Sequence, residues 1–384
     1  MTILSIGYTR ELFEDNIYSD TRQRLLFYSQ QLDKYYVIAH SMLRDGLKPK
    51  KIADNFEAIP SGGINRAHSF FKIISIGSRI CSRERVDLIQ AQDPVFTGLA
   101  GRILSLMYKI PMDVTVYGIN PFDKHWRSES FFNKIAAPLA KYILRKANGI
   151  QVDGSQAMCS LIQNKLDPSR IFLKPLVPLD SHNFYNSDGS QIRDKLLGSQ
   201  FDKIVLFVGR LTKQKNLKLY MQVIKSIVAE FNNRVLFVIV GQGNEEIKIK
   251  KLASNLGIDH NIIWIPRLSR SEIPLYFAAA DVFALPSLYE GFARVLMEAA
   301  MAGKPIITTA VSGADDAVIN GETGFIVGIN NKAEFKDRLK DLLKNEAIAK
   351  KMGSKAQKLM REKYDSNKIL WKQIEIWNQV IKAK

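Results

Sequence analysis

The sequence predicts an α/β protein made of two Rossmann-like, doubly wound domains. Three observations lead to this fold class. The chain has 384 residues, more than one hydrophobic core usually organises. Short apolar segments alternate with helical patterns, as they do in doubly wound sheets, and this alternation runs twice. A segment with two prolines, 174–184, separates the two runs and has the composition of a linker.

Each half supplies its own set of predicted strands. Those of the first half lie at 2–6, 36–40, 86–90, 112–117 and 149–153. Those of the second half lie at 203–208, 234–240, 261–265, 281–285, 305–309 and 324–327, with helices such as 216–231 and 245–256 between them. Because helical patterns separate the strands, we expect parallel sheets in a domain over 1–174 and another over 175–363.

The domain boundary is predicted near Pro175, and the chain ends in a separate helical segment. Residues 364–384 carry Trp371 and Trp377 and are too apolar to remain unpacked in water. We therefore expect this segment to dock on a domain.

Composition sets broad limits on function. The chain is 46% hydrophobic and 24% charged, which is typical of a globular protein. Lys and Arg outnumber Asp and Glu by 55 to 38, so the net charge is +17. Such an excess favours nucleic acid, acidic lipid or phosphorylated partners. A merely solvated basic surface explains it equally well, so charge alone does not choose among these.

The cysteines and the first residues predict a compartment. Cys81 and Cys159 are the only cysteines, and neither has a CxxC or histidine partner, so we expect no disulfide framework and no zinc site. The opening MTILSIGYTR lacks a basic n-region and a cleavage site, and no apolar run is long enough to span a membrane. We expect a cytoplasmic protein.

The first chemical motif, GRLTKQKNL at 209–217, follows the strand at 203–208. Gly209 permits a tight exit from the strand, and Arg210 and Lys215 place two cations just before a helix. Cations beside a helix N-terminus form an anion site. By themselves, two such cations are more often solvated surface charges.

The next strand ends in VGQGN at 240–244. Gly241 and Gly243 would let a ligand approach the backbone closely, and a plain turn explains the pair nearly as well.

The most informative stretch is ADVFALPSLYEGFARVLMEAAMAGKPIITT at 280–309. A buried strand leads to an acidic-glycine turn at Glu290 and Gly291, and a helix over about 293–302 ends before Gly303. Glu298 is expected about two turns inside this helix. Two carboxylates eight residues apart prove nothing alone, because 38 acidic residues produce such pairs by chance. Their setting is more informative, since a helix N-terminus and its backbone amides suit a diphosphate and carboxylates accept hydrogen bonds from sugar hydroxyls.

These motifs, in this order and with Glu290 and Glu298 eight residues apart, resemble the retaining family 4 glycosyltransferases of GT-B fold. The resemblance extends to DLIQAQDPVFTGLAGRILSLMYKIPMDVTVYG at 87–118, which is similar to the acceptor-side domain of that family, so it covers nearly the whole chain. It implies a GT-B architecture with the donor cleft between the two domains, and a C-terminal helix that crosses back to the first domain.

The resemblance also implies that the protein uses a nucleotide diphosphate-sugar as co-substrate and needs no cofactor. It assigns a role to each of the motif residues. Arg210 and Lys215 would bind the diphosphate, Glu290 would hold donor-sugar hydroxyls, and Glu298 would bind the ribose. These roles make Glu290, Arg210 and Lys215 the catalytic candidates. The donor-binding set is Arg210, Lys215, Gly241, Gly243, Glu290, Gly291, Phe292, Ala293 and Glu298.

The sequence departs from the family pattern in its first half and after Phe292. The first loop, 8–24, lacks the family's usual glycine pair, and Gly62–Gly63 appears later. Tyr117–Gly118 stands where relatives often have His-Gly, which makes these two residues acceptor-side cleft candidates. Tyrosine hydrogen-bonds but cannot protonate like histidine near neutral pH. His125 does not match in spacing and is expected to be structural. Ala293 replaces the family's glycine.

The mechanism expected from these residues stabilises charge on a leaving diphosphate and aligns an acceptor hydroxyl. No Asp-x-Asp pair is present to hold a divalent ion, so we predict metal-independent transfer. The resemblance implies retention at the anomeric carbon without a protein nucleophile.

The acceptor is less constrained. Segments 65–85 and 126–146 mix aromatic and aliphatic residues with Lys and Arg, as helices that rest on anionic membranes do. Such helices are equally expected in any Rossmann-like domain. A saccharide or lipid-linked saccharide acceptor in cell-surface polysaccharide assembly fits both interpretations.

Three other functions stay open at the sequence level. A nucleotide-sugar epimerase could share the architecture, and a catalytically silent binding subunit could keep the fold. Nucleic-acid binding would use the charge, but no helix-turn-helix, zinc or RNP-like motif is present, so we expect no nucleic-acid partner.

Overall fold

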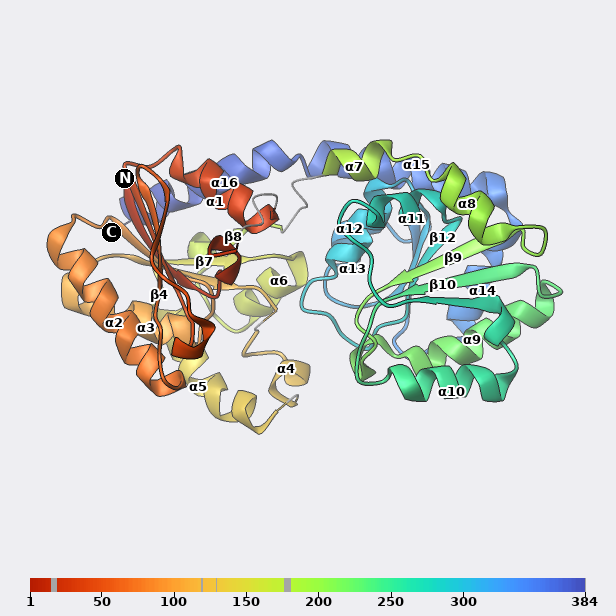
Figure 1. Cartoon of the computed structure of the whole chain (residues 1–384), viewed down its shortest axis with the longest axis horizontal. Coiled ribbons are helices and arrows are strands. Elements are labelled where there is room, and N and C mark those ends of the chain that lie inside the picture. Colours follow the sequence, from red (N-terminus) through yellow and green to blue (C-terminus); the bar gives the residue numbers. More distant parts are fainter. Residues whose placement is uncertain (15–18, 119, 129, 176–180, 384) are drawn as a thin grey trace. The chain divides into compact units, whose positions relative to one another are not determined.

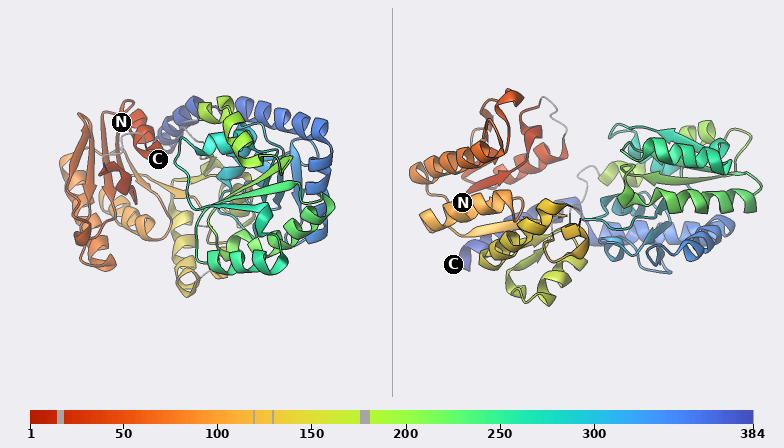
Figure 2. Two further views of the ribbon diagram at one scale, coloured as in Figure 1. Left: turned by 45° about the vertical axis from the view of Figure 1, so that its right-hand side comes forward. Right: turned by 90° about the horizontal axis from the view of Figure 1, so that it is seen from below.

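The computed structural model describes residues 1–14, 19–118, 120–128, 130–175 and 181–383; of His125 only the backbone is described. The chain divides into two compact units, unit 1 with Met1–Leu176 and Asn367–Lys384 and unit 2 with Val177–Ser366. Each unit is a sheet covered by helices (Figures 1 and 2). The sequence placed the corresponding boundaries at 174/175 and 363/364.

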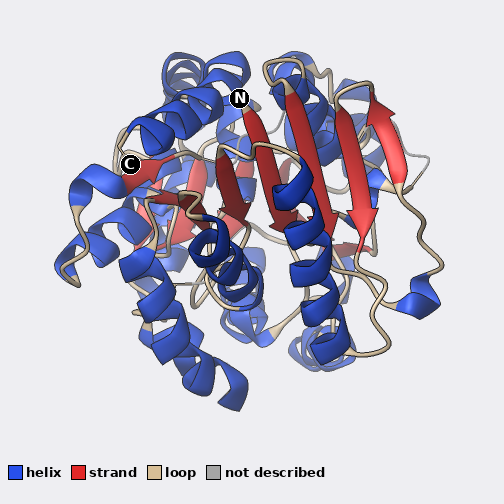
Figure 3. Ribbon diagram, turned by 90° about the vertical axis from the view of Figure 1, so that its left-hand side faces the viewer, coloured by secondary structure: helices blue, strands red, loops and turns tan. Residues whose placement is uncertain are grey.

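Unit 1 contains an eight-stranded sheet of order β3-β4-β2-β1-β5-β6-β7-β8, which Figure 3 shows in red. Its strands are parallel except β3, which pairs antiparallel with β4 through an irregular register. The strands are β1 Thr2–Gly7, β2 Lys34–Ala39, β3 Lys50–Ala53, β4 Phe56–Pro60, β5 Leu88–Ala91, β6 Met112–Val116, β7 Gly149–Val152 and β8 Ile171–Leu173.

The helices of unit 1 cover both faces of this sheet. They are α1 Asp20–Ser29, α2 Arg66–Arg83, α3 Phe96–Tyr108, α4 Lys124–Ser128, α5 Phe131–Lys146, α6 Ser155–Gln163 and α16 Ser366–Lys382. Side chains of α2 and α3, such as Ile73 and Leu104, pack in one cluster with Leu4, Ile38 and Ile89 of the strands. Residues of α5 and α6 form a second cluster with β6 and β7.

The C-terminal helix α16 packs within unit 1 beside α1 (Figure 1). The ring of Trp377 lies 5.4 Å from that of Tyr28, and Trp371 lies 5.4 Å from Phe27. Val380 lies so close to β7 that a Cβ at Gly149 would be 2.4 Å from it. Apolar burial on this helix, including a fully buried Trp377, accounts for its docking.

Unit 2 contains a parallel six-stranded sheet of order β11-β10-β9-β12-β13-β14. Its strands are β9 Lys203–Val208, β10 Val235–Val240, β11 Ile262–Ile265, β12 Val282–Leu285, β13 Ile306–Thr309 and β14 Gly324–Val327. Its helices are α7 Ser181–Asn186, α8 Ser190–Leu197, α9 Leu217–Glu230, α10 Glu246–Leu256, α11 Ile273–Ala279, α12 Arg294–Met301, α13 Ala314–Ala317, α14 Lys332–Lys344 and α15 Glu346–Lys363.

The helices of unit 2 form two groups. α9 packs with α10 and α14, whereas α12 packs with α7 and α15, and the two groups lie on opposite sides of the sheet in Figure 1. β9 and β10 are almost wholly buried, which is why both are nearly continuous apolar runs in the sequence.

Every predicted strand is present, with ends shifted by at most two residues. The sequence missed β3, β4 and β8. KKIA is too charged to resemble a buried strand, FEAIP contains a glutamate and a proline that interrupt its apolar pattern, and β8 has only three residues. The predicted linker 174–184 was partly wrong, because 181–184 belong to α7; residues 176–180 lie outside the described part.

Within the described residues, no helix combines the length and the apolar character that crossing a membrane requires.

Candidate functional site

The motifs of unit 2 meet at one edge of its sheet. β9 is followed along the chain by β10 on one side, whereas β12 lies on its other side, so the order of strands reverses between β9 and β12. In open α/β sheets, ligands bind beyond the carboxyl ends of the strands at such a switch point. The loops that follow β9 and β12 carry Lys215 and Glu290.

Lys215 and Glu290 form a buried ion pair. Lys215 ends a short 3₁₀ turn, Lys213–Lys215, and its Nζ lies 2.6 Å from Glu290 Oε1. Their side chains are only 10% and 7% exposed. A buried charge requires a partner of opposite sign, and each residue supplies that partner to the other.

Two neutral donors complete the environment of the Glu290 carboxylate. The Ser287 hydroxyl donates to Oε1 at 2.5 Å, and Gln214 Nε2 donates to Oε2 at 3.1 Å and to the Tyr289 carbonyl at 2.9 Å. A carboxylate has about four acceptor positions. Three of them are used, so the carboxylate is fixed in orientation and Oε2 keeps one position for a ligand hydroxyl.

The other charged residues of the site are more accessible. The Arg210 side chain is exposed and has no ion pair among the described residues. Arg294 Nε lies 3.4 Å from Glu298 Oε1. Glu298 lies in the second turn of α12, which agrees with its predicted place inside this helix; α12 begins at Arg294 and ends at Met301, each one residue from the predicted bounds.

The backbone before α12 provides free donors. In the described part of the chain, the N–H groups of Gly291 and Phe292 make no hydrogen bond, whereas Ala293 N donates to the Ser312 carbonyl at 3.3 Å. Of these three residues of the predicted donor-binding set, Gly291 and Phe292 therefore have amides available to a ligand, whereas the Ala293 amide is already hydrogen-bonded.

Gly241 and Gly243 are explained by contacts inside the protein. A Cβ at Gly241, whose φ is +145°, would lie 1.9 Å from the Gly209 carbonyl oxygen, and one at Gly243 would lie 2.2 Å from that of Leu211. The loop after β10 is therefore pressed against the loop after β9. This packing holds the Arg210 backbone in place and accounts for both glycines without a ligand.

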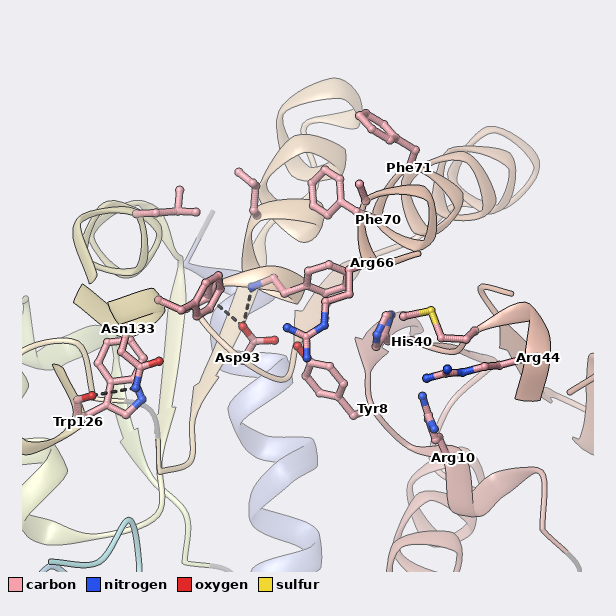
Figure 4. A pocket seen from close by; sticks show the side chains of 17 residues that line it. Tyr8, Arg10, His40, Arg44, Arg66, Phe70, Phe71, Asp93, Trp126 and Asn133 are labelled. Carbon is pink, nitrogen blue, oxygen red and sulfur yellow. Dashed lines mark hydrogen bonds between the residues drawn. The ribbon is translucent and has the colours of Figure 1, made fainter. Parts of the chain in front are cut away.

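Unit 1 contains a cavity of about 860 Å³ at its own switch point, where β2 and β5 flank β1 (Figure 4). Tyr117 and Gly118, the predicted cleft residues, do not line it. The Tyr117 hydroxyl instead faces the Lys174 carbonyl at 3.5 Å. The cavity is lined by Tyr8, Arg10, His40, Met42, Arg44, Arg66, Ala67, Phe70, Phe71, Asp93, Val95, Phe96, Leu99, Trp126, Phe132, Asn133 and Leu139.

Two polar residues of this cavity are fixed by the protein. His40 Nδ1 lies 2.6 Å from the Ser69 hydroxyl, and burial together with Arg10 and Arg66 lowers the His40 pKa. Asp93 accepts from the backbone of Val95 and Phe96 at 2.6 and 2.7 Å, and from Thr97. Asp93 therefore serves the start of α3, and the lowered pKa favours the neutral form of His40.

No group of three or more His, Cys, Asp or Glu in the described part of the chain is arranged to hold a metal ion.

Comparison with known protein families gives a match within unit 2. Residues 189–359 match the family model described as Glycosyl transferases group 1. This segment is therefore similar to the glycosyl transferases group 1 domains. It carries every donor-binding residue predicted above. Gln214 and Ser287, which orient Glu290, lie inside motifs quoted above, but the sequence did not single them out.

Two curated relatives illustrate the match. N-acetyl-alpha-D-glucosaminyl L-malate synthase of Bacillus anthracis is 27% identical over 204 residues, 53% of this chain and 52% of the relative. The capsular polysaccharide biosynthesis glycosyltransferase CapM of Staphylococcus aureus is 33% identical over 192 residues, 49% of this chain and 48% of the relative. The chain thus aligns with about half the length of each relative.

Solved structures extend the similarity from the group 1 domain to the whole chain. Sucrose-phosphate synthase from Thermosynechococcus elongatus superposes with a TM-score of 0.83 over 100% of both chains at 18% identity. HepE of Anabaena in complex with UDP superposes with a TM-score of 0.76 over 98% of this chain and 99% of its own, also at 18% identity. The chain has the GT-B fold.

Proposed function

We propose that the protein is a retaining glycosyltransferase that moves a sugar from a nucleotide diphosphate-sugar to a saccharide or lipid-linked saccharide acceptor in cell-surface polysaccharide assembly. The observation that carries the proposal is the buried Lys215–Glu290 pair at the switch point of a glycosyl transferases group 1 domain. The name of CapM refers to capsular polysaccharide biosynthesis, which supports the cell-surface role.

The donor proposal rests on charge and free donors in one place. Lys215 has three N–H donors and uses one on Glu290, so two remain for a phosphate oxygen. Arg210 and the amides of Gly291 and Phe292 add further donors. HepE structures contain UDP or UDP-glucose, which supports a nucleotide-sugar here.

In the proposed reaction, the acceptor hydroxyl attacks the anomeric carbon, the bond from that carbon to the diphosphate oxygen breaks, and the nucleoside diphosphate leaves with both electrons. The hydroxyl proton passes to the leaving phosphate. Lys215 and Arg210 stabilise the charge that develops on this phosphate. Glu290 holds a sugar hydroxyl, since three donors stabilise its carboxylate as a bound anion and make it a poor nucleophile.

A nucleotide panel tests this proposal. UDP, GDP, ADP and dTDP are added with and without EDTA to the wild type and to Lys215→Ala and Glu298→Ala, and thermal unfolding is followed. One nucleotide is expected to stabilise the wild type but neither variant, and EDTA is expected to have no effect. Equal stabilisation of wild type and variants would contradict the site, and loss with EDTA would contradict metal independence. Donor turnover without any acceptor would favour an epimerase.

An anionic membrane surface is proposed as a partner of unit 1. Helix α5 exposes Phe131, Ile135 and Tyr142, which are 77%, 63% and 46% exposed and lie on one stripe. Lys134 and Lys141 flank this stripe. Such a helix binds the interface of anionic bilayers through apolar burial and charge. Sedimentation with phosphatidylglycerol vesicles should recover the wild type but less of Phe131→Ser/Ile135→Ser, whereas Ile247→Ser, exposed in unit 2, serves as control.

A further inference from the structure

The cavity of unit 1 has a basic end. Arg10 follows β1, Arg44 follows β2 and Arg66 begins α2, and Figure 4 shows their guanidinium groups near Tyr8 and His40. These three arginines are far apart in sequence, and only the strand order brings them to one cavity.

The charges at this end are only partly balanced. Arg10 Nη2 lies 3.2 Å from Asp45 Oδ2, whereas Arg44 and Arg66 have no ion pair among the described residues. Asp93 is a further carboxylate in the wall, but backbone and hydroxyl donors at the start of α3 occupy its oxygens. Two guanidinium groups are therefore available to an anion, and guanidinium binds phosphate oxygens in a bidentate manner.

The rest of the cavity wall is apolar. Phe70 and Phe71 come from α2, Leu99 from α3, and Phe132 and Leu139 from α5. Phe71 and Phe132 are 66% and 60% exposed. An apolar occupant would remove this aromatic surface from water, and the cavity has the size of those that enclose small organic ligands.

We propose that this cavity binds the acceptor and that the acceptor is an anionic amphiphile, with a phosphate or diphosphate ester next to a hydrocarbon group. The phosphate contacts Arg44 and Arg66, with Arg10 beside them, and the hydrocarbon contacts the aromatic wall. A free phosphate leaves the apolar wall unused, and a neutral lipid leaves the guanidinium groups unused. This inference rests on the proposed glycosyltransferase function and names its acceptor class.

Calorimetric titration of the full chain with geranyl diphosphate tests the proposal, with inorganic pyrophosphate and geraniol as partial ligands. Geranyl diphosphate is expected to bind most tightly. Arg44→Gln and Arg66→Gln should each weaken the binding of geranyl diphosphate by about tenfold. Arg79→Gln, which changes an exposed arginine on the same helix as Arg66, should leave this binding unchanged. Phe132→Ala should weaken geranyl diphosphate and leave pyrophosphate unchanged.

Three results would overturn the proposal. Pyrophosphate could bind as tightly as geranyl diphosphate, which would make this a plain phosphate site. Geranyl diphosphate could bind equally to the Arg44, Arg66 and wild-type proteins. Geraniol could bind as tightly as geranyl diphosphate, which would make the cavity a plain apolar site with no use for its guanidinium groups.

The nucleotide panel separates this inference from the proposed function. If a nucleotide stabilises the chain through Lys215 and geranyl diphosphate does not bind, only the acceptor class fails. If geranyl diphosphate binds with the expected arginine dependence and no nucleotide acts, the transferase function fails, and with it the acceptor role of the cavity.

Discussion

The two units carry switch points of the same topology but treat charge in opposite ways. In unit 2, the lysine at the switch point is buried against Glu290 at 2.6 Å. In unit 1, Arg44 and Arg66 stand at a cavity without counter-ions among the described residues. A paired site is rigid before its ligand arrives, whereas cations without partners leave charge for a ligand to neutralise. One topology can thus support two kinds of charged site, one in which a counter-ion inside the protein fixes the charge and one in which the charge is left without a close partner.

The largest effect is expected from breaking the pair in unit 2. Lys215→Ala should reduce turnover about a thousandfold, because it removes a cation from the leaving phosphate and leaves the Glu290 carboxylate buried without a counter-ion. Lys213→Ala, an exposed lysine in the same turn, is the control. The measurement is the initial rate of nucleoside diphosphate release at low temperature, with circular dichroism to confirm folding. A Lys215→Ala rate within tenfold of wild type would contradict the role.

The second largest effect is expected from a substitution that disturbs the close packing between the loops of unit 2. Gly241→Ala forces a Cβ to within 1.9 Å of the Gly209 oxygen at a φ of +145°. It should destabilise unit 2 by about 3 kcal/mol, as incompatible backbone substitutions do. At Gly257, whose φ is +69°, no atom lies near the new Cβ, so alanine there should cost only about 1 kcal/mol. Calorimetric unfolding distinguishes the two, and equal losses would refute the packing argument.

A third prediction concerns a buried lysine in unit 1 that has no hydrogen bond to a carboxylate among the described residues. Lys174 donates to Gln373 and faces Tyr28, and burial together with Arg24 lowers its pKa to about 7, although Asp113 acts the other way. Between about pH 7 and 10 the unfolded lysine is protonated and the folded one is not, so the free energy of unfolding rises with pH. The slope approaches about 1.4 kcal/mol per pH unit.

Lys174→Met should remove this contribution to the slope. Burial also lowers the pKa of Lys304 to about 8, and this lysine adds to the slope equally in both proteins. The quantity to measure is therefore the difference in slope between wild type and variant, from urea denaturation at pH 7.5, 8.5 and 9.5. Lys72→Met, at an exposed position on α2, should keep the wild-type slope. Identical slopes for the wild type and Lys174→Met would show that Lys174 stays charged in the folded state.

The smallest effect is expected from removing the carboxylate that pairs with Arg10 at the cavity of unit 1. Asp45→Asn removes the partner of Arg10 and keeps an oxygen that can accept from Met42 N. Because partly exposed ion pairs contribute at most about 1 kcal/mol, geranyl diphosphate should bind about threefold tighter. Asp54→Asn, which removes the exposed carboxylate paired with Lys51, should leave calorimetric affinity unchanged. Weaker binding in Asp45→Asn would mean that Asp45 orients Arg10 for the ligand.

The donor-site candidates were found from the sequence because they lie in contiguous motifs. GRLTKQKNL and SLYEGFARVLMEA each follow a buried strand, so the strand pattern alone locates Lys215 and Glu290 at the sheet edge. The cavity of unit 1 could not be found in this way. Arg10, Arg44 and Arg66 belong to three separate segments, and none is part of a recognisable motif. The switch-point rule, applied to the loops after 2–6 and 36–40, is a signal that could have indicated Arg10 and Arg44, whereas Arg66 follows β4, a strand that the sequence missed.

Residue identity by itself determined the strand pattern, the two-unit division and the residues that carry charge beyond β9 and β12, since apolar periodicity and glycine placement are local properties of the chain. The tertiary structure decided the rest. Only the tertiary structure pairs Lys215 with Glu290, packs Gly241 closely against Gly209, and places three arginines from distant segments around one cavity. The physical reason is that pairing, close approach and charge excess depend on distances between loops, which strand order sets and no local pattern encodes.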